Sequence, residues 1–325
     1  MAAPLKGGLT LRWAPNADWA GLLAAIVIGS VVLAFVSPNF LSEFNIYVLL
    51  RSACVGILVA FAQMLTLAVG QMNLAVGALG GMVAILFGGM MEMFGVPLWL
   101  AVPLAVAIGV AGGFVNGLLA AHTGINGFIV TLATGSAFTG VNLGLTKSVP
   151  FYKMPHALQD FGNGRFGAFP FLLIAPIVVS PLLALFLFRL PVGRRLLAVG
   201  GNSEAAALSG VSPANAIVLA HCLSGLLAAI GAVLAVAQLG SAQPLIGSDW
   251  LLLSFAAPII GGTALAGGYV SIVGAILAVV VIALIQNGLV LVNADPYWVQ
   301  FLLGALIVAA IALNRWRARP IRLGW

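Results

Sequence analysis

Long apolar runs separated by short polar stretches dominate this chain. Each of ten runs approaches the roughly 20 residues that an α-helix needs to cross the hydrocarbon core of a bilayer. The runs are residues 19–36, 46–69, 75–93, 97–121, 125–145, 170–188, 214–239, 250–267, 271–292 and 297–313. This pattern predicts an all-α, polytopic transmembrane bundle of about ten helices. The first run is long for the ~7–15-residue core of a signal peptide and lacks a small-x-small cleavage site after it, so we expect a retained helix.

Composition supports the same fold class. Of the 325 residues, 62% are hydrophobic and only 6% are charged, whereas a soluble domain carries about 25% charged residues. Forty glycines fit a bundle whose helices approach closely. Cys54 and Cys222 both fall in apolar runs, where we expect small core residues rather than a disulfide or a metal pair.

The few charges predict the orientation of the bundle. The net charge is +6, and basic residues flank the apolar runs at Lys6, Arg12, Arg189, Arg194, Arg195, Arg315, Arg317, Arg319 and Arg322. Under the positive-inside rule these flanks are cytoplasmic, so the basicity requires no nucleic-acid partner. We therefore expect a cytoplasmic tail at 1–18, a transmembrane domain at 19–313 and a cytoplasmic basic tail at 314–325. Within that domain, the loop 189–213 would be cytoplasmic and the loop 146–168 external.

Two of the apolar runs are interrupted by glycines, and we call these interruptions the first break and the second break. Residues 69–77 read VGQMNLAVG and residues 260–268 read IGGTALAGG, and both contain the skeleton Gly-x-x-x-Leu-Ala-x-Gly. Asn116-Gly117-Leu118 is likewise echoed by Asn287-Gly288-Leu289. These echoes favour two related halves, as in transporters whose sites lie at broken helices. Irregular backbone at membrane depth is tolerated only where it is buried or faces a cavity.

A polar island at 198–210 contains the signals of a short, separate helix. Asn202 or Ser203 is a suitable N-cap, Glu204 suits the positive helix end, and Gly210 is a natural terminator. Ser212-Pro213 then starts the next membrane helix. A helix of about two turns is not stable alone, so we expect it to pack on a partner; a connector lying on the bilayer surface is the alternative.

The island resembles the cytoplasmic coupling segment of ABC-importer permeases, in particular those of the ribose/galactose/xylose/arabinose type. The motif Gly-Gly-Asn-x-Glu-Ala-Ala-x-x-Ser-Gly is matched by residues 200–210. Further matches follow in the family's order at Ser37-Pro38-Asn39-Phe40-Leu41, Gly127-Phe128-Ile129-Val130-Thr131-Leu132, Ser241-Ala242-Gln243-Pro244, 261–268 and 287–289. The resemblance covers residues 37–313. It departs at 70–77, where Asn73 and Ala75 replace the usual carboxylate and hydroxyl, and at Tyr269-Val270 and Pro258.

The resemblance implies a permease subunit that forms the path for a monosaccharide or similar small polyol. It implies three kinds of partner in the bacterial inner membrane: an ABC ATPase, expected to have tandem domains; a periplasmic binding protein; and a second permease copy or paralogue. The chain contains no phosphate-binding loop, so ATP and Mg would be held by the ATPase, and we expect no cofactor here. The residues expected to contact the ATPase are Gly201, Asn202, Ser203, Glu204, Ala205, Ala206, Ser209 and Gly210.

The candidate path residues are polar or aromatic positions in the apolar runs and at the first break. They are Gln71, Asn73, Asn116, Phe128, Thr131 and Asn287. For each polar residue alone, a hydrogen bond between helices, the usual role of such residues in membranes, is the favoured interpretation. The first break around Gln71 and Asn73 is the strongest candidate for lining a path.

Two other classes of function compete with this hypothesis. An ion-coupled secondary transporter usually needs ionisable groups inside the membrane, but all seven acids fall at or near predicted helix ends. An intramembrane enzyme is disfavoured because His122, His156 and His221 are far apart in sequence and no serine lies in a Gly-x-Ser-x-Gly elbow. For His122 and His221, both placed near helix ends, we expect structural hydrogen bonds. No metal site is predicted.

Overall fold

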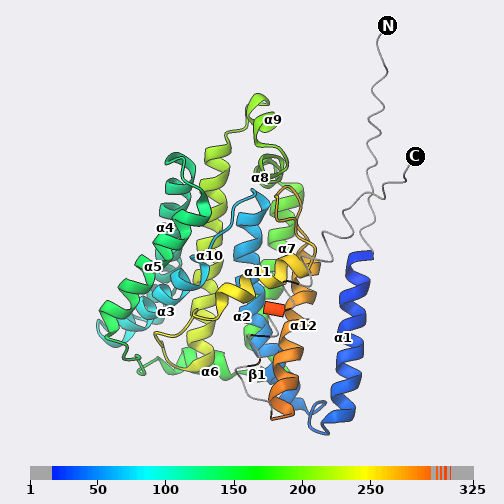
Figure 1. Cartoon of the computed structure of the whole chain (residues 1–325). Coiled ribbons are helices and arrows are strands. Elements are labelled where there is room, and N and C mark those ends of the chain that lie inside the picture. The colour runs from blue at the N-terminus through cyan, green and yellow to red at the C-terminus, as the bar shows by residue number, and fades with distance from the viewer. Residues whose placement is uncertain (1–16, 294–297, 299–300, 302–303, 306–307, 309–325) are drawn as a thin grey trace, which may run out of the picture.

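The computed structural model describes residues 17–293 together with Trp298, Phe301, Gly304, Ala305 and Val308. The predicted tails at 1–16 and 314–325 lie outside the described residues, as does most of the tenth apolar run at 297–313. The described part is a helical bundle with a single two-stranded hairpin (Figure 1). The predicted all-α membrane fold is therefore confirmed.

The described elements follow the predicted runs closely, except at 250–267, where the helix is shorter than predicted. In the first half they are α1 (Ala17–Val36), α2 (Glu43–Ala68), α3 (Val76–Glu92), α4 (Leu98–His122), α5 (Gly127–Thr146), α6 (His156–Asn163), β1 (Arg165–Phe166) and β2 (Phe169–Pro170). In the second half they are η1 (Phe171–Leu173), α7 (Ile174–Arg189), α8 (Pro191–Gly201), α9 (Ser203–Leu208), α10 (Pro213–Leu239), α11 (Trp250–Ile260) and α12 (Ile272–Leu291).

Seven of the described helices are long and apolar enough to cross a membrane, the span at 171–189 being η1 together with α7. α3, with 17 residues, and α11, with 11, are shorter. The predicted run 250–267 is thus wrong in its second half, because the helix ends at Ile260 and Gly262 adopts a left-handed φ of 90°. That conformation is accessible to glycine and not to most residues of a helix.

The core of the bundle lies around α2, α3 and α10, with Phe61 and Phe87 among its largest fully buried side chains. α10 packs along α4, and a Cβ on Gly109, Gly113 or Gly117 of α4 would collide with atoms of α10. Glycine thus lets these two backbones touch, as is common between membrane helices. α1 lies at the periphery, packed mainly on α12 (Figure 1).

The two ends of the bundle carry different structures (Figure 1). One end, called here the α9 end, carries α8 and α9; the opposite α6 end carries α6 and the β1–β2 hairpin. The predicted loops 189–213 and 146–168 therefore lie at opposite ends, as their assignment to opposite sides requires. The first loop contains a helix, α8, that the sequence interpretation had treated as irregular, because its glycines and arginines gave no apolar run.

Residues 242–260 replace a regular membrane helix by a series of turns and bends followed by α11. At the α6 end, Ala242 pairs with Phe151 through two backbone hydrogen bonds of 2.9 Å. The segment then follows α3: a Cβ on Gly88 would meet Ala242, and a Cβ on Gly77 would meet the carbonyl of Gly247. Those two glycines are 11 helical residues apart, or about 16 Å at 1.5 Å per residue. α11 thus begins about halfway through a ~30 Å bilayer core.

Candidate functional site

Both ends of α9 are fixed by local hydrogen bonds. The Asn202 side chain is the N-cap and accepts from an amide one turn on, at 2.9 Å. At the other end Gly210 has a φ of 81°. The amides of Gly210 and Val211 donate to the carbonyls of Ala207 and Ala206, both at 3.0 Å. This is the Schellman arrangement, which satisfies carbonyls that the helix end leaves free. Asn202, rather than Ser203, is therefore the cap.

The exposed surface of α9 differs from the one expected from the sequence. Leu208 is 91% exposed, whereas Ala206 is only 6% exposed and faces the bundle. Gly201, Asn202, Ser203, Glu204, Ala205, Ser209 and Gly210 are exposed. Leu208 was missed as a candidate contact, although it follows Glu204 by one helical turn and so shares its face. An apolar side chain this exposed on a short capped helix is suited to bury itself in a partner.

The end of α8 touches both breaks through backbone atoms alone. The amide of Gly268 donates to the carbonyl of Ala68 at 3.0 Å. A Cβ on Gly200 would collide with that same Ala68 carbonyl, and one on Gly267 would lie 2.7 Å from the Gly70 nitrogen and 2.8 Å from the Gly200 carbonyl. We call this contact of three segments the glycine junction. It joins the segment that contains α8 and α9, called here the α8–α9 loop, directly to both breaks.

Asn73 organises the first break, although it is only 1% exposed. Its side-chain oxygen accepts from the amide of Ala75 at 2.9 Å, and its amide donates to Ser224 on α10 at 3.1 Å. When the side-chain amide of Gln63 is oriented to pair with the backbone of Asn73, its nitrogen donates to the backbone carbonyl of Asn73 at 2.8 Å. Its oxygen then accepts from the backbone nitrogen of Asn73 at 3.2 Å. These bonds satisfy backbone groups that would otherwise be left unpaired between α2 and α3.

The other predicted path residues divide into two groups. Thr131 is fully buried and bonds the amide of Leu74 at 3.0 Å, so it fixes α5 to the break. Asn287 forms a reciprocal amide pair with Asn45 at 2.8 and 3.0 Å, which links α12 to α2. Asn116 is fully buried against α10. These three, like Asn73, are buried or half-buried inside the chain, whereas Gln71 and Phe128 line a cavity of about 780 Å³.

The two candidate structural histidines differ in the structure. His122 at the end of α4 has its Nδ1 3.1 Å from the carbonyl of Leu118, as expected of a hydrogen-bonded histidine. His221, predicted near a helix end, instead lies fully buried well inside α10. Within the described part of the chain, both of its ring nitrogens lack a hydrogen-bond partner. The expectation for His221 was therefore wrong, because the residue lies about two turns into α10, where that helix packs closely on Gly113 and Gly117 of α4.

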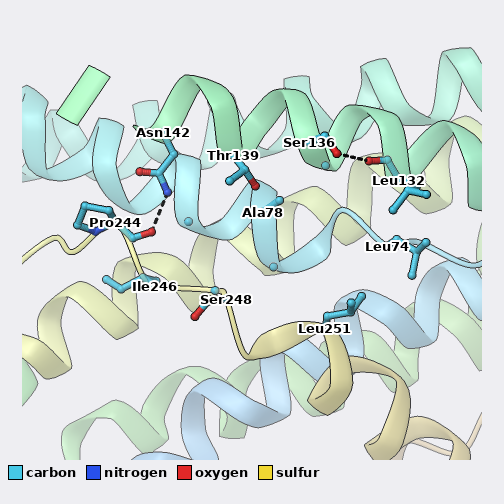
Figure 2. Close-up of a pocket in the computed structure, with 14 residues that line it drawn as sticks. Leu74, Ala78, Leu132, Ser136, Thr139, Asn142, Pro244, Ile246, Ser248 and Leu251 are labelled. Carbon is cyan, nitrogen blue, oxygen red and sulfur yellow. Dashed lines mark hydrogen bonds between the residues drawn. The ribbon is translucent and has the colours of Figure 1, made fainter. Parts of the chain in front are cut away.

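Two cavities follow one face of α5. The first, about 450 Å³, lies between α3, α5 and the segment 244–251, and its polar lining consists of side chains such as Thr139 and Asn142 (Figure 2). The second, about 780 Å³, lies toward the α9 end where the first break meets the start of α5. Phe128 lines the second cavity and Leu132 the first. These residues are one helical turn apart, so both cavities face the same side of the helix.

Apolar side chains lie where the two cavities adjoin. Met72 and Phe128 line the second cavity, while Leu74 and Leu132 line the first. All the described residues that line these two cavities are uncharged. Such a surface suits a solute without a net or paired charge, because a buried ion needs an opposite charge or several hydrogen bonds.

This combination of features defines a class of protein. Broken helices, uncharged cavities and a capped surface helix joined to the breaks are the parts of a membrane transport permease. The comparison with known sequences specifies the family: residues 45–311 match the family described as "Branched-chain amino acid transport system / permease component". The chain belongs to this family and is a multi-pass permease component of an ABC importer.

Curated relatives align over most of both chains. The ribose import permease protein RbsC of Bacillus subtilis is 34% identical over 91% of this chain and 92% of its own. The D-allose transport system permease protein AlsC of Escherichia coli is 31% identical, and the autoinducer 2 import system permease protein LsrD of Photorhabdus luminescens is 30% identical, each over 90% of both chains. No solved structure matches this chain. The resemblance stated from the motifs is confirmed.

Proposed function

We propose that this chain forms the translocation path of an ATP-driven importer for a monosaccharide or a similarly small neutral polyol. The observation that carries the proposal is the glycine junction. It joins the exposed α8–α9 loop, which a partner can grip, to both breaks, and the first break lines the second cavity. A displacement of α9 therefore acts directly on the segments that border the cavities.

The uncharged cavities favour a sugar over an amino acid, despite the description of the family. A zwitterionic amino acid carries an ammonium and a carboxylate, and each needs a charged or strongly hydrogen-bonding partner when it leaves water. Lys, Arg and His are absent from the described linings of the cavities. Two of the relatives are named for sugars, ribose and D-allose, and such solutes need hydroxyl-bonding groups only.

Charge placement supports a cytoplasmic position for the α9 end in the bacterial inner membrane. Arg189, Arg194 and Arg195 lie at this end, on α7 and α8, and short basic loops stay on the cytoplasmic side. α1 also starts on this side (Figure 1), after Lys6 and Arg12 in sequence. The α6 end then faces the periplasm, where a solute-binding protein would dock on α6 and the hairpin.

The partners follow from this orientation. An ABC ATPase would receive α9, with Leu208 entering an apolar groove and Glu204 contacting its polar rim. That ATPase would hold ATP and Mg and perform the hydrolysis. A second permease, either a copy or a paralogue, would cover the exposed face of α5 and close the cavities into a path. The broken helices of α3 and α11 line this shared face.

Reconstitution in proteoliposomes tests the proposal. The permease would be combined with the ATPase and the binding protein that co-purify with it, and uptake of D-ribose, D-allose and L-leucine would be measured. We expect ATP-dependent accumulation of a sugar and none of leucine. Sugar uptake driven by an ion gradient without ATP would instead establish the alternative, a secondary transporter. Leucine uptake would overturn the choice of solute.

A further inference from the structure

Asp249 is placed inside the membrane by the course of the segment before it. That segment leaves the α6 end at Ala242 and descends along α3 until Gly247 packs on Gly77. Asp249 follows two residues later and precedes the first residue of α11. Because this depth is about 16 Å below the contact of Gly88 with Ala242, the carboxylate lies near the middle of the bilayer core. The N-terminal end of α11 therefore lies inside the membrane and not at its surface.

A carboxylate at this depth cannot face lipid without a large cost. Asp249 is nevertheless exposed in the isolated chain. Although it occupies the N-cap position of α11, its side chain makes no capping hydrogen bond. Its charge is therefore neither buried in the protein nor used to complete the helix. A carboxylate at this position requires a space in front of it that is filled by water or by a polar solute.

Such a space is present as a cavity of about 360 Å³ between α2, α10, α12 and the segment 243–250. We call it the Asp249 cavity. Its polar lining combines one carboxylate with three amides and a hydroxyl, from Asp249, Gln238, Gln243, Gln286 and Ser52. Its volume lies at the small end of the ~300–1,000 Å³ range of ligand sites. It is separated from the cavity of Figure 2 by the segment 244–251, which borders both.

The chemistry of this lining matches several adjacent hydroxyl groups. A carboxylate accepts hydrogen bonds from two hydroxyls, and each glutamine amide can both donate and accept. The nearby Arg51 guanidinium bonds the side-chain oxygen of Asn163 and the backbone carbonyl of Gln238, so it is already engaged. A solute with its own carboxylate would face Asp249 without a cation in the lining.

We propose that the Asp249 cavity is a solute subsite of the path, in which Asp249 accepts hydrogen bonds from the hydroxyls of a neutral polyol. The subsite rests on the proposed function, since it binds the same solute during its passage through the path. Asp249 and the three glutamines distinguish polyols from apolar or anionic solutes of equal size. Because the carboxylate is placed halfway across the membrane, its hydrogen bonds replace those with water that the hydroxyls of the solute lose on entering.

Four variants test the subsite in the reconstituted importer. Asp249→Leu removes both acceptor oxygens, while Asp249→Asn keeps the shape and one of them. Gln286→Leu removes an amide from another wall of the same cavity, and it keeps the test decisive if the Asp249 variants do not assemble. Leu252→Ala, the control, changes an exposed residue of α11 that is absent from the described linings of the three cavities. The probes are D-ribose and D-allose, with L-leucine for comparison.

The measured quantity is the number of sugar molecules taken up per ATP hydrolysed. Hydrogen bonds to charged groups are strong enough that Asp249→Leu should lower this ratio by about 10-fold or more, with a smaller loss for Asp249→Asn and Gln286→Leu. Hydrolysis stimulated by the loaded binding protein should persist, since the α8–α9 loop is untouched. A purely structural role would lower hydrolysis and uptake together. Leu252→Ala should behave as wild type.

The other outcomes are equally decisive. Wild-type sugar uptake per ATP in the three cavity variants would overturn the subsite while leaving the importer in place. Uptake without ATP that is abolished by Asp249→Asn and by collapse of the proton gradient would make Asp249 a proton carrier and overturn the importer as well. Uptake of leucine instead of sugar, lowered by Asp249→Leu, would mean that the carboxylate binds an ammonium and would overturn the polyol chemistry.

Discussion

Gly200 and Gly201 are neighbours at the end of α8, yet an added methyl group would meet different surroundings at each. At Gly200 it would collide with the Ala68 carbonyl, and at Gly201 the nearest atom would be 4.0 Å away. The first neighbour is backbone and cannot rotate aside. Both residues lie in the same helix, so their difference in helix propensity is small. The pair therefore separates the effect of the junction from the effect of replacing glycine.

We predict that Gly200→Ala lowers the free energy of unfolding by about 1–3 kcal/mol, the usual cost of an added methyl in a packed site. It should also lower uptake, because the α8–α9 loop is pushed off the breaks. Gly201→Ala should change stability by less than about 0.5 kcal/mol. Thermal melting of the purified permease and uptake by vesicles measure the two effects. Equal behaviour of the two variants would show that the junction has no mechanical importance.

Local chemistry at single residues was largely predictable from the sequence. The caps of α9 follow from Asn202 and Gly210, because the residue types themselves favour these conformations. Gly70 was likewise correctly placed between two helices. What the residues could not reveal was their surroundings. Asn73 and Thr131 are polar residues in apolar runs, and only the packed structure distinguishes a bond to the next helix from a surface along a path.

At the scale of an element, α9 combines rigidity with an exposed apolar tip. Its two capped ends hold a helix that has only six residues, and Leu208 extends from it. Ala206 anchors the inner side. The element therefore has one face that belongs to the bundle and another that is free for a partner.

Two substitutions in α9 should impair coupling without disturbing the membrane helices. Leu208→Asp removes the apolar tip and should weaken ATPase binding, with a loss of about 1.5–3 kcal/mol from the burial of one large side chain. Gly210→Val forces a β-branched residue to a φ of 81°, which is a true outlier for that residue type. Stimulated hydrolysis and uptake should fall together in both. Ala207→Ser, at an exposed residue of α9 outside the expected contact set, serves as the control.

This prediction can fail clearly. Normal uptake in Leu208→Asp and Gly210→Val, with the ATPase bound as in the wild type, would contradict a coupling role for α9. Pull-down of the ATPase on the detergent-solubilised permease determines whether binding is retained. Binding lost in Leu208→Asp alone would still identify the tip as the contact.

The elements that the sequence described poorly are those set by tertiary contacts. α11 was predicted to be 18 residues long because its apolar composition continues past Ile260, and only the left-handed glycines at 262, 267 and 268 end it. α8 was missed because packing on α7, rather than an apolar run, stabilises it. Asp249 was assigned to a membrane surface on the assumption that helices start there. Periodicity and composition contain no information on the depth at which a helix begins.

For the whole molecule, the opposite positions of the α8–α9 loop and the α6 hairpin define its orientation in the membrane. Single cysteines test this orientation once Cys54 and Cys222 have been replaced. Ser203→Cys on α9 should react with an impermeant maleimide only in inverted membranes, whereas Tyr152→Cys, at a residue 65% exposed near the α6 end, should react in intact cells stripped of the outer membrane. The reverse pattern would invert the proposed direction of transport.

The crossing at 242–260 has a consequence for how the protein enters the membrane. An 11-residue helix reaches only about 16 Å, and the turns before it are held in part by bonds to other elements, such as those of Ala242 with Phe151 and of the Pro244 carbonyl with Asn142. This crossing therefore cannot be released laterally from the translocation machinery as a stable span of its own. It must wait until α2, α3 and α10 are in the bilayer and offer it a groove.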